Sequence, residues 1–239
     1  MMGKLLSVTG AVALSAWVLL GGSAAAEKAV KLPAPTLDTP AAASSTTSPR
    51  ETAVFAGGCF WGVQAVFQHT QGVLNAVSGY AGGDKATATY ASIGSGRTGH
   101  AEAVQITYDP KQISYGKLLQ IYFSVAHDPT TLNRQGPDSG TQYRSVIFYR
   151  DANQKQVAER YIAQLDAAKV FPGKIVTQLT PLTPALAFYP AEAYHQDYAT
   201  LNPHQPYIAR FDLPKIANLK TMMPELYRDK PVLVSQSRS

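Results

Sequence analysis

The chain contains a single cysteine, Cys59, among its 239 residues. No intramolecular disulfide can therefore form, and the fold has to rest on a buried apolar core. Cys59 lies in the segment FAGGCFWG, directly after two glycines and directly before two large aromatic side chains. A lone thiol is a reactive group, a site of intermolecular pairing or an inert buried side chain. Its position alone leaves these alternatives open.

The N-terminus has the pattern of an export signal. Lys4 gives a short positive start, an apolar run follows over residues 10–20, and small residues end it before Glu27. This pattern predicts a signal peptide over residues 1–26, cleaved after Ala26. An uncleaved membrane anchor is the alternative, but a spanning helix needs about 20 apolar residues. We therefore expect an exported, periplasmic protein with no stable membrane insertion after cleavage.

Composition divides the rest of the chain into three parts. Residues 27–50 contain four prolines, many Ala, Ser and Thr, and few large apolar side chains. Such a segment buries too little surface to offset its ordering entropy, so it is predicted to be a disordered linker. Residues 51–213 suit one domain with a sizeable core. Residues 214–239 are predicted to be a tail that packs partly or not at all.

Charge and motif patterns exclude several classes of function. The net charge is +5, from 21 basic and 16 acidic residues, and the basic residues are scattered along the chain. This distribution gives no nucleic-acid footprint. No His, Asp and Cys residues have metal-ligand spacing, and no glycine pattern fits a nucleotide site. We expect a monomer that holds no metal and no cofactor.

Hydrophobic periodicity predicts alternating strands and helices. The predicted strands cover residues 51–57, 72–81, 101–109, 143–149 and 174–180, and the predicted helices cover 59–68, 114–125, 151–169 and 191–200. Long loops are expected between, over residues 82–100 and 127–142. The order through Tyr149 is β-α-β-β-α-β, which predicts an α+β fold with a two-layer ferredoxin-like (split βαβ) core and long loops.

The two glycines before Cys59 predict a tight turn from a strand into a helix. Cys59 then lies in the first helical turn, where unpaired N–H groups and the helix dipole favour a thiolate. Phe60 and Trp61 are adjacent and cannot both point into one core, so we expect at least one near the surface. An aromatic wall beside a nucleophile suits an apolar group such as a methyl.

Several motifs occur in order between Thr52 and Pro203: GCFWG, GRTGHAEAVQITYDP, HDPT, GTQYRS and YHQDYATLNP. In this set of motifs the chain resembles the peptide methionine sulfoxide reductase A family. The resemblance implies a catalytic domain over residues 51–213. It also implies thiol-dependent reduction of the S epimer of methionine sulfoxide, free or in proteins, and hence protein repair. Cys59 is the sole thiol and would be the nucleophile.

The resemblance implies roles for four further residues. Glu102 would protonate the sulfoxide oxygen, Tyr90 and Tyr143 would hydrogen-bond it, and Asp138 would orient this network. Glu102 has to be desolvated to keep a proton near neutral pH. Each residue also has a plain alternative: Glu102 as a surface strand carboxylate, Asp138 as a turn former, and each tyrosine as an ordinary aromatic.

Other side chains are assigned to the substrate pocket, and two rival functions remain. The substrate-binding residues are predicted to be Phe60, Trp61, Gly58 and His195. The first rival is a thiol hydrolase or acyltransferase that uses Cys59 with His100 or His195. The second is a non-enzymatic module that binds exposed methionine through its aromatic pair.

Two positions depart from the family pattern. Many relatives carry a second cysteine where this chain has Gly94, and others carry cysteines near the C-terminus, where this chain has none. Recycling through an internal disulfide is therefore excluded, and an external thiol, such as a thioredoxin-like protein, has to reduce the sulfenic acid. The glutamate that often follows GCFWGV is Gln64 here, which removes a negative charge one turn from the thiol.

Overall fold

The computed structural model describes residues 27–38 and 50–236. The predicted signal peptide over residues 1–26 lies outside these ranges, as do residues 39–49 of the predicted linker. Within the described ranges, no helix is long and apolar enough to cross a membrane.

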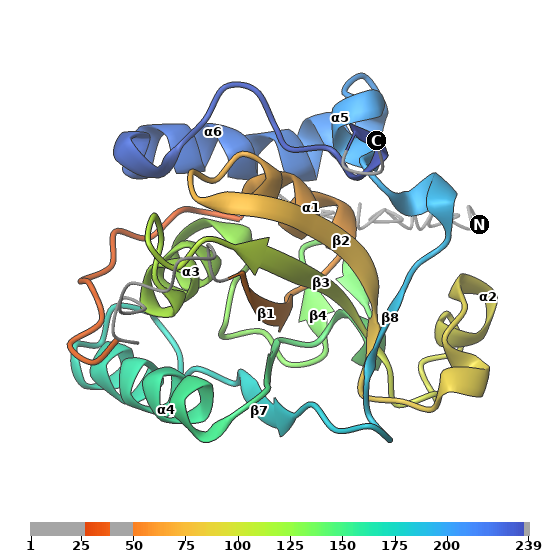
Figure 1. Cartoon of the computed structure of the whole chain (residues 1–239), viewed down its shortest axis with the longest axis horizontal. Coiled ribbons are helices and arrows are strands. Elements are labelled where there is room, and N and C mark those ends of the chain that lie inside the picture. The colour runs from red at the N-terminus through yellow and green to blue at the C-terminus, as the bar shows by residue number, and fades with distance from the viewer. Residues whose placement is uncertain (1–26, 39–49, 237–239) are drawn as a thin grey trace, which may run out of the picture.

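A six-stranded curled sheet forms the centre of the molecule, with the strand order β7-β6-β1-β3-β2-β8 (Figure 1). β1 pairs antiparallel with both β3 and β6, and β2 pairs antiparallel with β3 and β8. Only β7 runs parallel to its neighbour in this sheet, β6. The bounds are β1 Glu51–Ala56, β2 Val73–Ala81, β3 Ala101–Tyr108, β6 Val146–Tyr149, β7 Gln178–Pro181 and β8 Phe188–Pro190, and a separate hairpin pairs β4 Arg134–Gln135 with β5 Asp138–Ser139.

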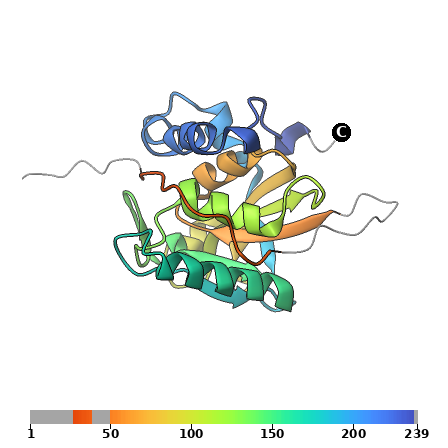
Figure 2. The same ribbon diagram turned by 90° about the vertical axis from the view of Figure 1, so that its left-hand side faces the viewer.

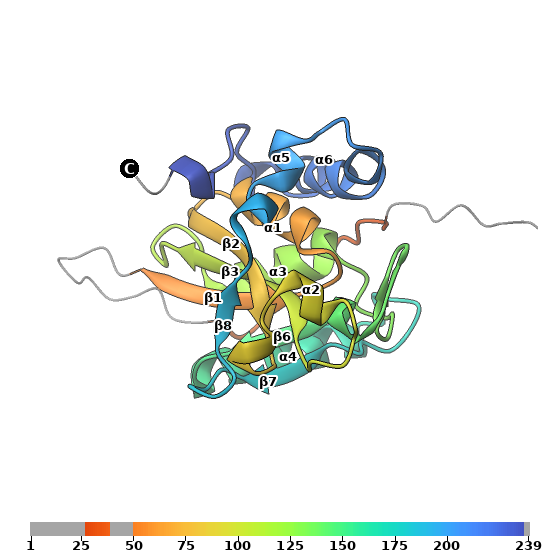
Figure 3. The same cartoon turned by 90° about the vertical axis from the view of Figure 1, so that its right-hand side faces the viewer.

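Helices cover the sheet, and one of them is covered in turn. α1 packs against β2 and β3, α4 packs against β6 and β7, and α6 lies over α1 (Figures 1 and 3). The bounds are α1 Phe60–Gln68, α2 Tyr90–Ile93, α3 Tyr115–Ile121, α4 Ala152–Ala167, α5 Tyr198–Leu201 and α6 Leu213–Met222. Ser114 and Asp151 cap α3 and α4 as expected, since their side chains accept backbone hydrogen bonds from Lys117 and Gln154.

The strands alternate between two apolar faces. Along β1, Ala53 and Phe55 join the main core, whereas Val54 and Ala56 join a second buried cluster on the opposite face. Both faces are buried because helices cover one and the segment containing Leu182 and Phe188 covers the other. The prediction of an α+β fold is therefore confirmed.

The predicted loops contain more regular structure than expected. The loop over 82–100 contains α2, and the loop over 127–142 contains the β4–β5 hairpin. The helix predicted over 191–200 is instead a 3₁₀ turn, Ala193–His195, followed by α5. These elements are too short to show a hydrophobic period, so no pattern distinguishes them from loops.

The prediction of a disordered linker is wrong for Glu27–Asp38, which we call the N-terminal strap. The strap runs as an extended segment across α3 and α4 (Figure 2). Hydrogen bonds fix it along its length: Val30 N to Ser124 O (3.0 Å), Gln120 Nε2 to Leu32 O (2.8 Å), Tyr161 Oη to Pro33 O (2.8 Å) and Gly116 N to Asp38 Oδ1 (2.7 Å). Its prolines suit an extended chain, and side chains from the helices satisfy its carbonyls.

The strap offers a matched pair of leucines for a stability test. Leu32 is buried in the main core at 6% exposure, whereas Leu37 is 37% exposed. We expect Leu32→Ala to lower the free energy of unfolding by about 2 to 3 kcal/mol. Leu37→Ala should change it by less than about 0.5 kcal/mol. Urea unfolding followed by circular dichroism measures both, and equal effects would mean that the strap does not dock.

The predicted domain boundary at residue 213 is also wrong. α6 begins there and packs on α1, so the domain continues through it. Further on, Val234 is 5% exposed, and its N–H donates to Asp197 Oδ1 at 3.0 Å. The Ser235 N–H donates to the other oxygen of the same carboxylate, also at 3.0 Å. A single buried carboxylate thus anchors the C-terminal segment, which composition alone does not reveal.

Candidate active site

Cys59 caps the N-terminus of α1, as the glycines before it predict. Gly58 has φ +84°, and a Cβ there would lie 2.6 Å from Gln135 Cβ. A Cβ at Gly57 would lie 2.8 Å from the His127 ring. Both glycines are therefore required for the chain to turn so closely against neighbouring loops.

The glycine turn gives a second stability prediction. Gln135 cannot move aside easily, because its side chain bonds Asp128 N at 3.0 Å and Asp128 O at 2.6 Å. We expect Gly58→Ala to lower the free energy of unfolding by about 2 kcal/mol, from the positive φ and this contact. Gly94→Ala is the control, since its φ is −57° and its Cβ would meet only Tyr90 O at 3.7 Å. Thermal unfolding measures the loss of stability in both variants. Equal losses would contradict the claim that the turn requires glycine at residue 58.

Glu102 lies at the start of β3, on the face that carries the main core. Its side chain is 2% exposed, and its Oε2 accepts a hydrogen bond from Phe60 N at 3.0 Å. Burial raises the pKa of Glu102 to about 8, and the charges of Asp138 and Asp212 add to this. The carboxyl group is therefore a buried acid beside the first turn of α1, and the alternative of a surface carboxylate is wrong.

The pKa of Cys59 departs from the expectation of a favoured thiolate. The backbone N–H of Trp61 lowers the pKa of the thiol, as a helix N-terminus predicts. Burial is the larger effect, and together with the charges of Glu102 and Asp212 it raises the pKa well above its ordinary value. Desolvation by the surrounding protein therefore outweighs the helix N-terminus.

The charges of Glu102 and Cys59 act on both predicted tyrosines. Tyr90 begins α2 and is 43% exposed, and Tyr143 ends the 3₁₀ turn Thr141–Tyr143. Burial raises the pKa of both phenols, and the charges of Glu102 and Cys59 act on each. Both phenols therefore keep their protons and can donate hydrogen bonds.

Asp138 lies in β5 and is held by a residue that sequence analysis missed. The Tyr207 hydroxyl donates to Asp138 Oδ2. Burial raises the pKa of Asp138, while the hydrogen bond from Tyr207 and the charge of Lys215 lower it. Tyr207 lies outside every recognised motif and 69 residues beyond Asp138, so no local signal connects the two.

The aromatic pair divides between core and surface as predicted. Phe60 is 1% exposed, whereas Trp61 is only partly buried and stacks on Tyr198 with ring centroids 4.0 Å apart. The indole N–H of Trp61 donates to His195 Nδ1 at 3.2 Å. The His195 ring also contacts Phe60 and Tyr90, with centroids 5.0 and 4.6 Å away. His195 is thus part of the aromatic wall, as expected.

The histidines do not form the arrangement that a Cys-His hydrolase needs. The hydrogen bond from Trp61 occupies one ring nitrogen of His195, and His100 Nε2 bonds Asp84 O at 3.0 Å. Among the described residues, no hydrogen bond joins either histidine to Cys59. Gln64 also faces away from the thiol, since its amide bonds Ala76 O and Gln196 Oε1.

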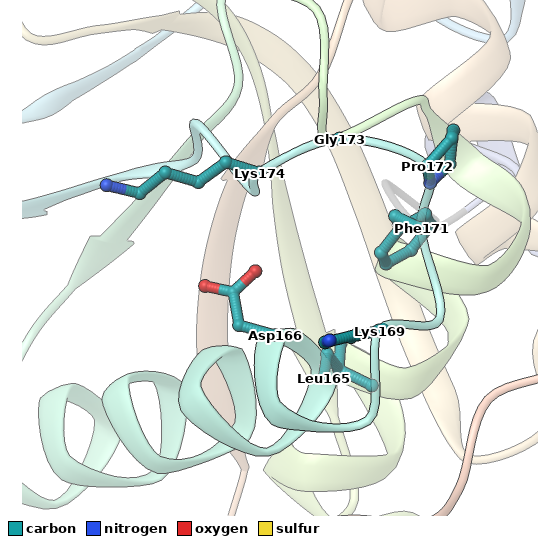
Figure 4. A pocket seen from close by; sticks show the side chains of 7 residues that line it. All are labelled: Leu165, Asp166, Lys169, Phe171, Pro172, Gly173 and Lys174. Atoms are coloured by element: carbon teal, nitrogen blue, oxygen red, sulfur yellow. The ribbon is translucent and has the colours of Figure 1, made fainter.

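Outside the candidate active site, the described residues form a cavity but no metal-binding group. A cavity at the end of α4 is lined by Leu165, Asp166, Lys169, Phe171, Pro172, Gly173 and Lys174, none of which is a predicted site residue (Figure 4). Over residues 27–38 and 50–236, no group of three or more His, Cys, Asp and Glu side chains could hold a metal ion. The absence of a metal and of a cofactor stays a prediction.

Comparisons with known proteins identify the family of this chain. Residues 51–225 match the family model described as peptide methionine sulfoxide reductase. A Mesorhizobium japonicum protein named peptide methionine sulfoxide reductase MsrA 2 is 64% identical over 184 residues, which cover 77% of this chain and 93% of that protein. A Synechocystis protein of the same name is 50% identical over 187 residues, covering 78% of this chain and 84% of that protein.

Solved structures give the same relationship. Methionine sulfoxide reductase A of Corynebacterium diphtheriae has a TM-score of 0.57 and 34% identity, and the match covers 77% of this chain and 90% of that chain. Reduced Mxr1 from Saccharomyces cerevisiae has a TM-score of 0.57 and 33% identity, with coverage of 65% and 87%. The chain belongs to the peptide methionine sulfoxide reductase family.

Proposed function

We propose that this protein reduces methionine sulfoxide, free or in oxidised proteins and peptides, to methionine. Membership of the family supports this activity. The observation that carries it is a buried carboxylic acid beside the residue that follows the only thiol: Glu102 accepts a hydrogen bond from the N–H of Phe60, next to Cys59. A nucleophile and a proton donor thus meet at the start of one helix.

The proposed first step transfers the sulfoxide oxygen to Cys59. The thiolate attacks the sulfoxide sulfur while Glu102 protonates the oxygen, and Tyr90 and Tyr143 hold that oxygen by hydrogen bonds. The protonated oxygen then moves from the substrate sulfur to Cys59 Sγ, so the substrate sulfur–oxygen bond and the transient sulfur–sulfur bond both break. Methionine leaves, and Cys59 becomes a sulfenic acid. Asp138 orients the donors, and Phe60, Trp61, Gly58 and His195 form the wall against the substrate methyl. The S epimer is the proposed substrate.

The second step needs a thiol from outside the chain. Cys59 is the only cysteine, so no internal thiol can attack the sulfenic acid. One external thiol forms a mixed disulfide with Cys59 and releases water, and a second thiol frees Cys59 and leaves the reductant oxidised. A thioredoxin-like protein is the proposed reductant. The protein itself is proposed to act as an exported, periplasmic monomer without a metal or cofactor.

We also propose that the core is a ferredoxin-like split βαβ arrangement. The order β6-β1-β3-β2 supports this, because β3 lies between the two strands joined by α1, and β1 lies between β3 and β6. β7, β8, α6 and the N-terminal strap are additions to that core.

A two-epimer assay tests the proposed activity. The protein is incubated with each epimer of N-acetylmethionine sulfoxide and excess dithiothreitol, and the products are separated by chromatography. The proposal predicts that the S epimer is converted to N-acetylmethionine while the R epimer is retained. Conversion of neither epimer contradicts the proposed reaction, and equal conversion of both contradicts the stereochemical assignment.

A further inference from the structure

A buried cation lies behind the candidate active site, in α6. The side chain of Lys215 is 5% exposed, and its Nζ pairs with Glu27 Oε2 at 2.9 Å. Burial alone would lower the pKa of Lys215, but the charges of Glu27 and Asp212 raise it above its ordinary value. Lys215 is therefore charged, and a buried charge of this kind needs its partners.

The first turn of α1 packs directly on this charged group. A Cβ at Gly62 would lie 2.2 Å from Asp212 Oδ1 and 3.3 Å from Lys215 Cδ. Gly62 is three residues after Cys59, so only the absence of a side chain there allows α6 to bring its charges so close to the thiol. The charge of Cys59 in turn acts on Lys215.

Glu27 connects this cluster to the other side of the site. Its Oε1 would lie 3.8 Å from a Cβ at Gly136, in the turn between β4 and β5, and Asp138 follows in β5. Glu27 belongs to the N-terminal strap, which lies before the residues matched by the family model, 51–225. A segment outside the family match therefore supplies a charge between α6 and the hairpin.

Asp212 gives an independent sign that these charges are not a self-contained ion-pair network. Its side chain is fully buried, and among residues 27–38 and 50–236 neither of its carboxylate oxygens has a hydrogen-bond partner. Burial raises the pKa of Asp212 to about 7. The charge of Lys215 opposes this rise, and the charge of Glu27 adds to it. A buried carboxylate without hydrogen bonds is costly, so Asp212 indicates that the charges behind α1 serve more than local stability.

We propose that Lys215 is a positioning residue of the active site: its ammonium lies behind the first turn of α1 and stabilises the Cys59 thiolate against the neighbouring carboxylates, while its ion-pair partner Glu27 offsets part of this effect. This inference rests on the proposed role of Cys59 as the nucleophile. The N-terminal strap enters through Glu27, whose negative charge offsets part of the effect of the ammonium.

The sign of each charge effect follows from the groups that face Cys59. The carboxylates that act on the thiol are Glu102 from β3, Asp138 from β5 and Asp212 before α6. The charge of Cys59 acts on Tyr90 from α2, Tyr143 from the turn Thr141–Tyr143, Tyr207 before α6 and Lys215 from α6. Glu27 from the strap acts on Lys215, and His195 contacts Phe60, the residue after Cys59. The thiol titrates above its ordinary value, where Glu102 and Asp212 are already ionised. Removing a positive charge then raises the titration midpoint of Cys59, and removing a negative charge lowers it.

The test is the pH dependence of Cys59 alkylation by iodoacetamide in the full chain. One cysteine makes the modified site unambiguous, and mass spectrometry gives the rate. Lys215→Met should raise the pH midpoint of alkylation by about one unit. At a fixed pH below the midpoint, the alkylation rate should then fall about tenfold. Glu27→Gln should lower the midpoint. Asp38→Asn is the matched control, because Asp38 is the carboxylate at the far end of the strap and bonds Gly116 N.

Opposite shifts separate a charge effect from simple loosening of the fold. Loosening would admit water and lower the midpoint in every variant. A raised midpoint in Lys215→Met, a lowered one in Glu27→Gln and no change in Asp38→Asn support the inference. A midpoint that is unmoved or lowered in Lys215→Met overturns it. If Lys215→Met does not fold, Lys215→Gln decides: its midpoint should also rise, which loosening cannot produce, and an unmoved or lowered midpoint overturns the inference.

The alkylation test does not depend on methionine sulfoxide reduction. Iodoacetamide reports the thiolate directly, so the shifts can appear even if neither sulfoxide epimer is converted. If neither sulfoxide epimer is converted but the alkylation midpoints shift as predicted, the proposed function is wrong and the charge effect stands. Activity without the shifts removes only the role of Lys215.

Discussion

Cys59→Ser is expected to lose methionine sulfoxide reduction by at least about 1,000-fold, because a hydroxyl is a far weaker nucleophile than a thiolate and the chain holds no second thiol. The substitution changes one atom at a partly exposed position, so the fold should persist. Chromatographic detection of methionine with dithiothreitol as the reductant measures the loss.

Two controls make this result specific. The thermal unfolding midpoint of Cys59→Ser should match that of the wild type, which excludes misfolding. Substrate binding should survive, because Phe60, Trp61 and His195 remain in place. Retention of a tenth or more of the wild-type rate would show that the thiol is not the nucleophile. Binding without any turnover in the wild type would instead favour the methionine-binding module.

Glu102→Gln is expected to slow the first turnover by about 100- to 10,000-fold, the range for loss of a general acid. Glutamine can still accept the hydrogen bond from Phe60 N, so the start of α1 should keep its geometry. Rapid-quench measurement of methionine formed before any reductant is added isolates this step. An unchanged first-turnover rate would remove Glu102 from the acid role.

The pH profile of Glu102→Gln provides a second readout. The reaction needs the thiolate of Cys59 and the protonated form of Glu102, whose pKa is raised to about 8 by burial. Because the pKa of the thiol lies higher, the wild-type rate at low substrate concentration should rise with pH, stop rising near pH 8, and fall only when the thiol is fully ionised. The variant lacks the protonated acid, so its slower rate should continue to rise through pH 8. A bend near pH 8 in both proteins would contradict this assignment.

Much of the catalytic arrangement could be predicted from local sequence. The two glycines before Cys59 require a tight turn, which the structure contains. The buried position of Glu102 is implied only by the family resemblance, although the alternation along residues 101–108 places it on the same face as Val104 and Ile106. These are short-range consequences of backbone geometry and strand period. The predicted order of the main elements through Tyr149 matches the structure for the same reason.

Features that depend on distant contacts could not be predicted. Glu27 and Lys215 are separated by most of the chain, and nothing in either neighbourhood indicates that they pair. The N-terminal strap has the composition of a disordered segment, yet side-chain donors on α3, on α4 and at Ser124, just after α3, bond its backbone carbonyls. The pKa of Cys59 depends on burial, which a helix N-terminus alone does not reveal.

The most direct test of the central claim is a single turnover without reductant, followed by trapping with dimedone. The protein is mixed with excess S-epimer substrate, methionine is quantified, and the protein is analysed by mass spectrometry. One methionine per chain and one dimedone adduct on Cys59 are predicted, because a chain with a single thiol stops at the sulfenic acid. Continued turnover without a thiol, or methionine formed without an adduct on Cys59, would contradict the account.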